Sequence, residues 1–456
     1  MKIQIPLDER ISALAGELQK PLYLVGGYVR NYLIDKSLSE DIDLASELSP
    51  EALLPRLEGV GLKPLAEYKK TGTLVFGAKG LKCEYTAFRK DVYSVGGGHK
   101  PEKTIPTTDI LEDALRRDFK CNAVYYDVKN QKIVDPLGGV EDIKNKVLDT
   151  VKVPEEVFSH DGLRLMRLAR FCGELNFTPT KEVLESARVN ANNVLDVSAE
   201  RIYAELVRAL VSDTKYSFSD KKGHYTALKM LDKTQVLDKI FPELTLGRGM
   251  EQRADYHDYD VLEHSLKTVL YAPQEIRLYA LLHDVAKPYC MERDGKYHFH
   301  AVEGEKIAEK VLKRLKAPTK IIDNAKRLAK YHMLDMKRDM REAKLRRFIV
   351  DNLDILPSLL ALKQADFSAC KDCLDECSTV KKWKDLYAKM QGDGTPFTLM
   401  DLKITANDLK ELGYNGARLG AKLKALFYLC VENPKLNQKE RLISIAKGEK
   451  KVNDTK

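Results

Sequence analysis

Hydrophobic and polar residues follow two different periods along this chain. Residues 1–20 carry apolar side chains at helical spacing, which predicts a short helix. Beyond residue 20, short stretches are apolar or alternate with period two between glycines and prolines, as is typical of strands. The predicted elements are strands at 21–25, 41–44, 74–76, 81–88, 123–128 and 132–134, a helix at 29–33, and a glycine-rich loop at 94–101. Residues 20–135 are therefore predicted to form one mixed α/β unit.

From about residue 140 onward the strand pattern mostly stops and helical periodicity continues, with few helix-breaking residues inside each segment. The predicted fold class is α+β, with an N-terminal α/β head followed by an all-helical body and tail. A chain of 456 residues is too long for one typical domain. We predict four domains, at residues 1–140, 141–250, 251–375 and 376–456.

The overall composition is that of a folded protein. Hydrophobic residues make up 44% of the chain and charged residues 32%, which excludes wholesale disorder. No run of about 18 uncharged apolar residues occurs, and the first residues lack the continuous apolar stretch of a secretory signal. We therefore expect a cytoplasmic protein with no membrane association and with its eight cysteines reduced. Cys370, Cys373 and Cys377 lie close together but lack a second pair of ligands at zinc-finger spacing.

The net charge is +8, with a sequence pI of about 8.8. This modest basic excess is compatible with a polyanionic partner. More than half of the excess falls in residues 401–456, so we expect that end of the chain to contact the polyanion.

Two aspartates flank one apolar residue in the predicted strand at 41–44. Residues two apart on a strand point the same way, so Asp41 and Asp43 are expected to project from one face. Neighbouring carboxylates repel each other and attract a hard cation such as Mg²⁺, an arrangement typical of phosphoryl transfer. Glu84 is a candidate third carboxylate. Taken alone, an Asp-x-Asp sequence is also typical of a solvated strand edge.

A glycine pair lies upstream of these aspartates. Gly26 and Gly27 allow the backbone to approach an anion closely, and N–H groups at a helix start favour phosphate. Arg30 lies one turn into the predicted helix and can reach the same phosphates. The combination predicts a phosphate and metal site rather than an ordinary turn.

Residues 26–30 and 41–43 together resemble the signature of polymerase-β-type nucleotidyltransferases, in the branch that holds bacterial-type (class II) tRNA CCA-adding enzymes and poly(A) polymerases. Further segments resemble the same family in the same order, at 116–123, 135–139, 161–171 and 200–206. The resemblance covers nearly the whole chain. It implies a polymerase-β-like head that adds CCA to the 3′ end of tRNA without a template. It also implies CTP and ATP as substrates, Mg²⁺ on Asp41 and Asp43, and Glu84 as a further catalytic residue.

The resemblance also implies which residues bind the nucleotide. Asp161 and Arg164 would read the base, because Asp accepts a proton from the amino group of C or A while Arg donates to a ring acceptor. The further nucleotide-binding residues are Arg116, Arg117, Arg167 and Arg170. The residues from Asp161 to Arg170 recur every third position, which predicts a slanted polar stripe on one helix. Such a stripe is also typical of a charged, exposed helix face.

The chain departs from the family pattern at two places. His160 stands where the family has Glu, which leaves fine base selectivity open. Lys120 and Cys121 replace the customary Thr and Ile, a change expected to affect local packing more than chemistry.

A second group of histidines and carboxylates resembles an HD-type metal domain. It consists of His264, the pair His283 and Asp284, and the distant Asp366. Such ligands suit first-row divalent metals, and a metal-bound water there can hydrolyse phosphate esters, so a second divalent metal is implied. Accessory candidates are His298, His300 and His332. The alternative is a helical scaffold that merely buries hydrogen-bonded histidines.

Three alternatives to complete CCA addition remain open at this point. The first is a poly(A) polymerase or an enzyme that adds only C or only A. The second is an HD-type phosphohydrolase as the main activity, and the third is an RNA-binding protein without activity. The expected partner is tRNA, gripped by tail helices that resemble the family's at 397–436. The sequence predicts no particular oligomeric state.

Overall fold

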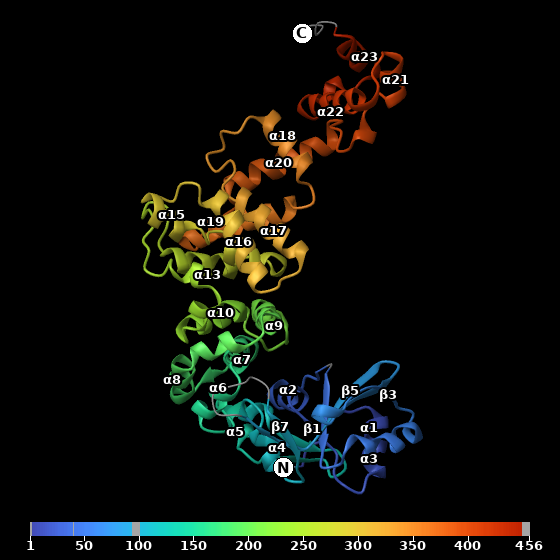
Figure 1. Ribbon diagram of the computed structural model, residues 1–456, viewed down its shortest axis with the longest axis vertical. Helices are drawn as coiled ribbons and strands as arrows, with labels where there is room; N and C mark the ends of the chain where they lie inside the picture. The colour runs from blue at the N-terminus through green and yellow to red at the C-terminus, as the bar shows by residue number, and fades with distance from the viewer. Residues whose placement is uncertain (1, 40, 94–100, 449–456) are drawn as a thin grey trace. The chain divides into compact units, whose positions relative to one another are not determined.

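The computed structural model describes residues 2–39, 41–93 and 101–448. They form two compact units (Figure 1). The first unit comprises Met1–Thr245 with Val311–Ala317, and the second comprises Leu246–Lys310 with Pro318–Lys456. The predicted loop at 94–101 lies, apart from residue 101, outside the described residues.

A seven-stranded sheet organises the N-terminal part of the first unit. Its strand order is β3-β4-β5-β2-β1-β8-β9, and all neighbours are antiparallel except β2 and β5, which are parallel. The strands are β1 (Tyr23–Val25), β2 (Ile42–Ser46), β3 (Lys63–Tyr68), β4 (Thr73–Ala78), β5 (Leu81–Ala87), β8 (Tyr125–Asp127) and β9 (Lys132–Val134). Smaller pairs are formed by β6 (Arg89–Val92) with β7 (Lys103–Pro106), and by β10 (Val147–Leu148) with β11 (Thr178–Pro179).

Each predicted strand corresponds to a strand of this sheet, and the α+β class is confirmed. Five strands were not predicted, namely β3, β6, β7, β10 and β11. The edge strand β3 exposes nearly all of its side chains, so its sequence carries no apolar alternation. Helices α1 and α3 lie together beside β3 and β5 (Figure 1).

The helices of the first unit include those predicted at 1–20 and 29–33, which correspond to α1 and α2. They are α1 (Glu9–Glu17), α2 (Gly27–Asp35), α3 (Pro50–Leu57), α4 (Ile110–Leu115), α5 (Gly139–Asn145), α6 (Pro154–His160), α7 (Leu163–Leu175), α8 (Lys181–Val189), α9 (Ala199–Leu210), α10 (Gly223–Lys233), α11 (Val236–Ile240) and α12 (Pro242–Thr245).

The second unit is helical in its described part. Its helices are α13 (Val261–Tyr271), α14 (Arg277–Leu282), α15 (Lys287–Asp294), α16 (His300–Arg314), α17 (Thr319–Tyr331), α18 (Glu342–Asp351), α19 (Leu356–Lys371), α20 (Ser378–Gly392), α21 (Ala406–Glu411), α22 (Gly416–Glu432) and α23 (Lys439–Lys447). Helices α13 and α19 pack side by side in this unit, and α21, α22 and α23 share a small apolar core around Leu409, Cys430 and Leu442. None of the helices described is both long and apolar enough to cross a membrane.

The turn between β1 and α2 depends on glycine. Gly26 has φ +75°, a backbone conformation that other residues rarely adopt. A Cβ at this position would also lie 3.1 Å from Asp43 Oδ2. Gly26 therefore lets the start of α2 lie directly beside a carboxylate of β2.

Helix α7 is buried along almost its whole length, and its position is fixed by a backbone contact with α10. An added Cβ on Gly173 would lie 2.3 Å from Gly223 O, and one on Gly223 would lie 2.5 Å from Gly173 O. Only glycine permits this approach.

We expect Gly173→Ala to lower the free energy of unfolding of the protein by about 1–3 kcal/mol, since the new methyl group must push α7 and α10 apart. Chemical denaturation followed by circular dichroism measures this. The matched control is Gly16→Ala in α1, where an added Cβ meets nothing within 4 Å. It should stabilise by about 0.5–1 kcal/mol through helix propensity. Equal effects of the two variants would contradict the role of the contact.

Candidate functional sites

Three carboxylates meet at the junction of β2 and β5. Asp43 on β2 pairs in register with Glu84 on the parallel neighbour β5, so their side chains share a face. Asp41 lies one residue before β2 begins, not inside the strand as predicted, yet it lines the same cavity as the other two. Asp43 is half-buried, whereas Asp41 and Glu84 are exposed.

The carboxylates are not neutralised by the protein. Among the described residues, no lysine or arginine forms an ion pair with Asp41, Asp43 or Glu84. Burial raises the pKa of Asp43 from its ordinary value of 3.8 to about 6. Glu84 and Asp41 raise this pKa further, and Arg117 partly opposes the change. Carboxylate oxygens that repel one another in this way are the ligands that Mg²⁺ prefers, so these residues fit a hard divalent cation.

A cavity of about 1040 Å³ joins the carboxylates to a wall of arginines. It brings together every residue that the sequence analysis assigned to the nucleotide site. These are Gly26, Gly27, Arg30, Asp41, Asp43, Glu84, Arg116, Arg117, Asp161, Arg164, Arg167 and Arg170. Sequence reasoning missed further lining residues, among them Lys82, Asn122, Arg201, Arg208, Lys215 and Tyr216. Asn122 and Arg201 lie inside the segments that resemble the family, at 116–123 and 200–206. The other four residues lie outside those segments.

Arg30 is buried, and its hydrogen bonds within the protein are to neutral groups. Its guanidinium donates to Asn122 Oδ1 at 2.5 Å, to Asn31 Oδ1 at 2.9 Å and to Tyr216 Oη at 3.1 Å. It also lies over the ring of Phe171 at 5.3 Å. Neutral partners orient the guanidinium without cancelling its charge, so Arg30 presents a fixed positive charge to an anion in the cavity.

Arg116 and Arg117 share a single buried carboxylate. Arg116 Nε donates to Asp113 Oδ1 at 2.7 Å, and Arg117 Nη2 donates to Asp113 Oδ2 at 3.1 Å. Tyr125 Oη also donates to Asp113 Oδ2. Two cations against one carboxylate leave one positive charge in excess at the cavity wall.

Arg167 and Arg170 are paired with carboxylates of the framework. Arg167 lies 2.6 Å from Asp118, and burial would raise the pKa of that carboxyl, but Arg167 and nearby donors hold it well below its usual range. Arg170 is buried between Glu174 and Glu205, each at 2.6 Å. Both arginines line the cavity, but their charges are already balanced.

The polar stripe predicted from Asp161 to Arg170 is wrong at its first position. Asp161 follows the end of α6, and Gly162 separates it from α7, so only Arg164, Arg167 and Arg170 share a helix. A Cβ on Gly162 would lie 2.1 Å from Asn193 O, so the turn here needs glycine. Spacing by threes could not reveal this break.

The two predicted base readers already have partners. Asp161 Oδ1 accepts from the Leu163 N–H at 3.0 Å. Arg164 Nη2 donates to Arg116 O at 2.6 Å, and its Nη1 donates to Val157 O at 3.3 Å. Backbone carbonyls therefore set the direction of Arg164.

His160 replaces the acidic residue of the family with a neutral ring. Its imidazole stacks on Tyr93, with ring centroids 4.5 Å apart and an interplanar angle of 10°. Burial lowers the pKa of His160, so the ring carries no charge at neutral pH. Arg164 thus has no carboxylate beside it at this position.

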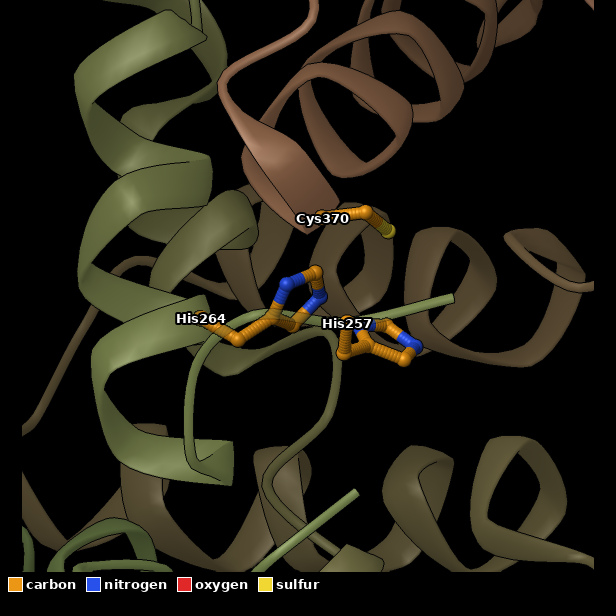
Figure 2. A group of neighbouring side chains, drawn as sticks. All are labelled: His257, His264 and Cys370. Atoms are coloured by element: carbon orange, nitrogen blue, oxygen red, sulfur yellow. The ribbon is translucent and has the colours of Figure 1, made fainter. Parts of the chain in front are cut away.

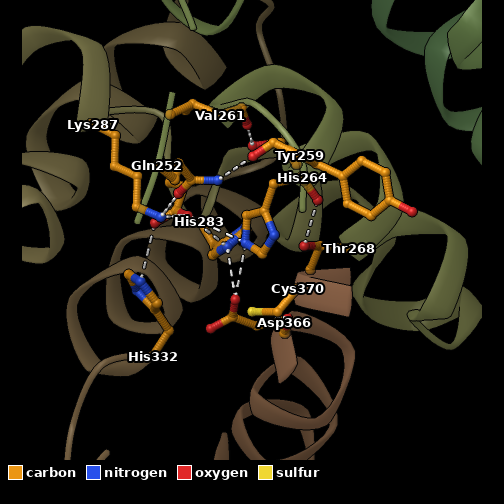
Figure 3. Close-up of polar contacts among 12 residues, drawn as sticks. Gln252, Tyr259, Val261, His264, Thr268, His283, Lys287, His332, Asp366 and Cys370 are labelled. Carbon is orange, nitrogen blue, oxygen red and sulfur yellow. Dashed lines mark hydrogen bonds and ion pairs between the residues drawn. The ribbon is translucent and has the colours of Figure 1, made fainter. Parts of the chain in front are cut away.

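Histidines, carboxylates and a cysteine gather in the second unit (Figure 2 and Figure 3). His264 comes from α13, His283 and Asp284 follow α14, and Asp366 comes from α19. His264 Nε2 lies 3.0 Å from Asp366 Oδ1, and His283 Nε2 lies 3.2 Å from Asp284 Oδ2. All four side chains are buried. The structure thus brings together the four residues predicted for the HD site.

Asp284 lies between two sets of ligand atoms. Its Oδ2 faces His283 and His264, while its Oδ1 lies 3.3 Å from His300 Nε2 and 3.4 Å from His332 Nε2. The two latter nitrogens are 3.3 Å apart. Of the accessory candidates, His300 and His332 therefore join the cluster, whereas His298 is exposed and does not.

The histidine rings are oriented as metal ligands require. Nδ1 of His283, His300 and His332 each lies 2.7 Å from a backbone carbonyl oxygen, which can only accept. Nδ1 therefore carries the proton, and the Nε2 lone pair points to the centre of the cluster. His283 Nε2 and Asp284 Oδ1 are buried without a hydrogen-bond partner among the described residues. This donor set fits divalent cations in two neighbouring positions, with Asp284 shared.

Sequence reasoning missed three residues at this cluster. Lys287 lies 2.6 Å from Asp284 Oδ2 and donates to Gln252 Oε1 at 2.7 Å (Figure 3). His257 and Cys370 lie beside His264 (Figure 2). Lys287 follows the His-Asp pair by one helical turn, a spacing that could have indicated it.

We expect Asp43 to contribute to the stability of the metal-free protein at low pH and to lose that contribution as the pH rises from about 4 to about 6. The folded state holds a proton on Asp43 more tightly than the unfolded chain does. The contribution of Asp43 to the free energy of unfolding is therefore complete when the pH is below the pKa of the unfolded chain, and it is lost as the pH rises through the pKa of the folded state. Thermal unfolding in a chelator measures it, and Asp43→Asn should remove that part of the slope. Above pH 7, added Mg²⁺ should raise the midpoint of wild type and not of Asp43→Asn. Equal responses of the two proteins would contradict the metal role of Asp43.

Family models match three parts of the chain. They are the poly A polymerase head domain at residues 22–149, the probable RNA and SrmB-binding site of polymerase A at 176–246, and the HD domain at 261–359. The crystal structure of the Bacillus stearothermophilus CCA-adding enzyme in complex with CTP has a similar fold, with a TM-score of 0.65, 22% identity and coverage of 96% of each chain.

Two curated relatives are similar over most of the chain. The A-adding tRNA nucleotidyltransferase of Deinococcus radiodurans is 31% identical over 361 residues, which is 76% of each chain. A multifunctional CCA protein of Acinetobacter baumannii is 31% identical over 325 residues, or 68% of this chain and 74% of the relative. The chain therefore belongs to the family of tRNA nucleotidyltransferases with a poly(A) polymerase head domain, and it carries an HD domain.

Proposed function

We propose that this protein adds CCA to the 3′ end of tRNA without a template, using CTP and ATP. The observation that carries the proposal is a single cavity. Its lining combines Asp41, Asp43 and Glu84 with arginines whose positive charge is not fully balanced by carboxylates. A triphosphate needs positive charge around it, and the cation that accompanies it needs carboxylate ligands, so the two must be bound in the same cavity.

The carboxylates would hold Mg²⁺, with Asp41 and Asp43 as ligands and Glu84 beside them. The chemistry that the cation supplies is activation of the RNA 3′-hydroxyl and neutralisation of the charge on the α-phosphate and the leaving pyrophosphate. Half-burial of Asp43 keeps its oxygens directed at the cavity and limits competition from water.

The basic part of the cavity lining would bind the triphosphate. Backbone N–H groups at the start of α2 lie beside Gly26 and Gly27, and Arg30 projects from the same helix. The excess charge of Arg116 and Arg117 would add to this attraction. Because these groups are held in place before the nucleotide binds, catalysis is mainly positioning and electrostatic stabilisation.

The base would be read by Asp161 and Arg164. Asp161 would accept from the amino group of C or A, and Arg164 would donate to the ring acceptor beside it. Arg164 would exchange one of its bonds to the carbonyls of Val157 and Arg116 for the base. Arg167 and Arg170 would shape the pocket rather than neutralise phosphate, since their charges are balanced.

The relatives differ in how much of CCA their names include. One is named as an A-adding enzyme and another as a multifunctional CCA protein. The test below therefore distinguishes complete CCA addition from three competing outcomes, which are addition of A alone, addition of C alone and addition of a poly(A) tail.

A second candidate function is favoured by the two-position ligand cluster around Asp284. We propose that it holds divalent metal and hydrolyses phosphate esters, with Lys287 able to donate to a phosphate oxygen. We further propose four functional regions, at 1–140, 141–250, 251–375 and 376–456, of which the last contacts tRNA.

The main proposal is tested by feeding nucleotides to tRNA that lacks its CCA end. We expect CTP alone to add two residues, ATP alone to add none, and both together to complete CCA. Asp43→Asn should slow addition by at least about a hundredfold, as expected when a charge-stabilising group is lost. His283→Ala, which alters only the second unit, is the matched control and should leave addition unchanged. Long poly(A) products from ATP alone, or addition of A only to tRNA that already ends in CC, would contradict complete CCA addition.

The metal cluster is tested by measuring bound metal per chain after loading with Mn²⁺. Asp284→Asn, which alters the shared ligand, should lose both ions, whereas His300→Ala should lose one and retain the other. Both variants should also lose hydrolysis of a chromogenic phosphate monoester while keeping nucleotide addition. His298→Ala is the matched control, since this exposed ring lies nearby without joining the cluster. Equal metal content in wild type and Asp284→Asn would exclude the cluster as a metal site.

A further inference from the structure

A third group of ligand atoms lies beside the cluster, and two of its three residues have no part in either proposed function. It consists of His257, His264 and Cys370, whose ligand atoms lie within 4.8 Å of one another (Figure 2). The two imidazole rings meet edge to face, with centroids 4.8 Å apart and an interplanar angle of 88°. Of these three residues, only His264 also belongs to the proposed HD site with His283, Asp284 and Asp366.

The backbone holds His257 and Cys370 together. Asp258 N, next to His257, donates to the carbonyl oxygen of Cys370 at 3.0 Å. Lys371 Nζ donates to Ala254 O at 3.4 Å, and Tyr259 Oη donates to Asp372 Oδ2 at 2.5 Å. The segment that carries His257 is thus fastened to the end of α19 that carries Cys370.

The ligand atoms are available. His257 Nδ1 is buried without a hydrogen-bond partner among the described residues, and so is His264 Nδ1. Cys370 Sγ donates to the helix carbonyl of Asp366 at 3.3 Å, which is a weak bond. A group of buried nitrogens and sulfur with so few partners is typical of a ligand site.

We propose that His257, His264 and Cys370 bind a thiophilic divalent cation such as Zn²⁺, at a position separate from the carboxylate-bearing ones. Two imidazoles and one thiolate are a common ligand set for Zn²⁺, with the fourth position left to water. On binding, the S–H bond of Cys370 breaks, a sulfur–metal bond forms, and one proton passes to solvent.

Sharing of His264 gives this site a regulatory consequence. When Nδ1 of His264 binds this cation, Nε2 carries the ring proton and donates to Asp366 Oδ1 at 3.0 Å, so the neighbouring position loses a ligand. Hard ions such as Mn²⁺ prefer the carboxylates, whereas Zn²⁺ and Cd²⁺ prefer the sulfur. Thiophilic ions therefore inhibit the proposed hydrolysis. This consequence rests on the second candidate function, whereas the metal site does not.

The site is tested by titrating the metal-free, full-length protein with Co²⁺ and recording the near-ultraviolet sulfur-to-cobalt charge-transfer band. We expect the band in wild type and its loss in Cys370→Ser, which is nearly isosteric. His257→Ala should weaken cobalt binding at this band by at least tenfold. Cys373→Ser is the matched control, because its sulfur lies on the same segment but bonds Asp375, and the band should persist. Circular dichroism of each variant verifies that it folds.

Inhibition is measured separately, on hydrolysis of the chromogenic phosphate ester in Mn²⁺ with added Zn²⁺. Cys370→Ser should need at least tenfold more Zn²⁺ for half-inhibition than wild type does. A band in wild type with no hydrolysis in any ion would support the site and count only against the proposed hydrolase. No band in wild type, or the same band in Cys370→Ser, would overturn the proposal.

Discussion

Mutual repulsion among three carboxylates is the constraint on which the rest of the head depends. The parallel pairing of β2 with β5 sets Asp43 opposite Glu84, and Gly26 leaves room for Asp43 beside the start of α2. The fold therefore buries Asp43 beside two other carboxylates, and burial together with their negative charge raises the pKa of Asp43 to about 6. Such a concentration costs stability unless a cation offsets it. The arginines that line the same cavity do not offset this negative charge, since none of the described guanidinium groups there forms an ion pair with the three carboxylates.

The arginines of the cavity divide into two groups by their partners. Arg167 and Arg170 are held by Asp118, Glu174 and Glu205, and they tie α7 to the head and to α9. Arg30 is held by neutral groups, and its charge remains available. The arginines of the cavity thus comprise a structural group and a group whose positive charge no carboxylate balances. The site in the second unit differs from this cavity in its residue types, because it combines histidines and carboxylates instead of arginines.

Much of the fold and of the candidate site could be predicted from sequence, and the failures have physical reasons. Strands with one buried face, such as β5, show the apolar alternation that reveals them, whereas the exposed edge strand β3 does not. Motifs identified the residues that line the cavity, but ion pairing such as that of Arg170 with Glu205 joins residues far apart in the chain. His257, which the sequence analysis missed, lies outside helices and strands, where no regular spacing connects it to its neighbours.

The parallel pairing of β2 with β5 has a consequence for biosynthesis. Parallel neighbours cannot be joined by a tight hairpin, so residues 47–80 must cross over before Glu84 can reach Asp43. Contacts between residues so distant in sequence close a long loop, which slows folding. A nascent chain that has just left the ribosome with β2 alone would expose two aspartates and no completed centre. The three carboxylates thus come together only after translation has passed Glu84.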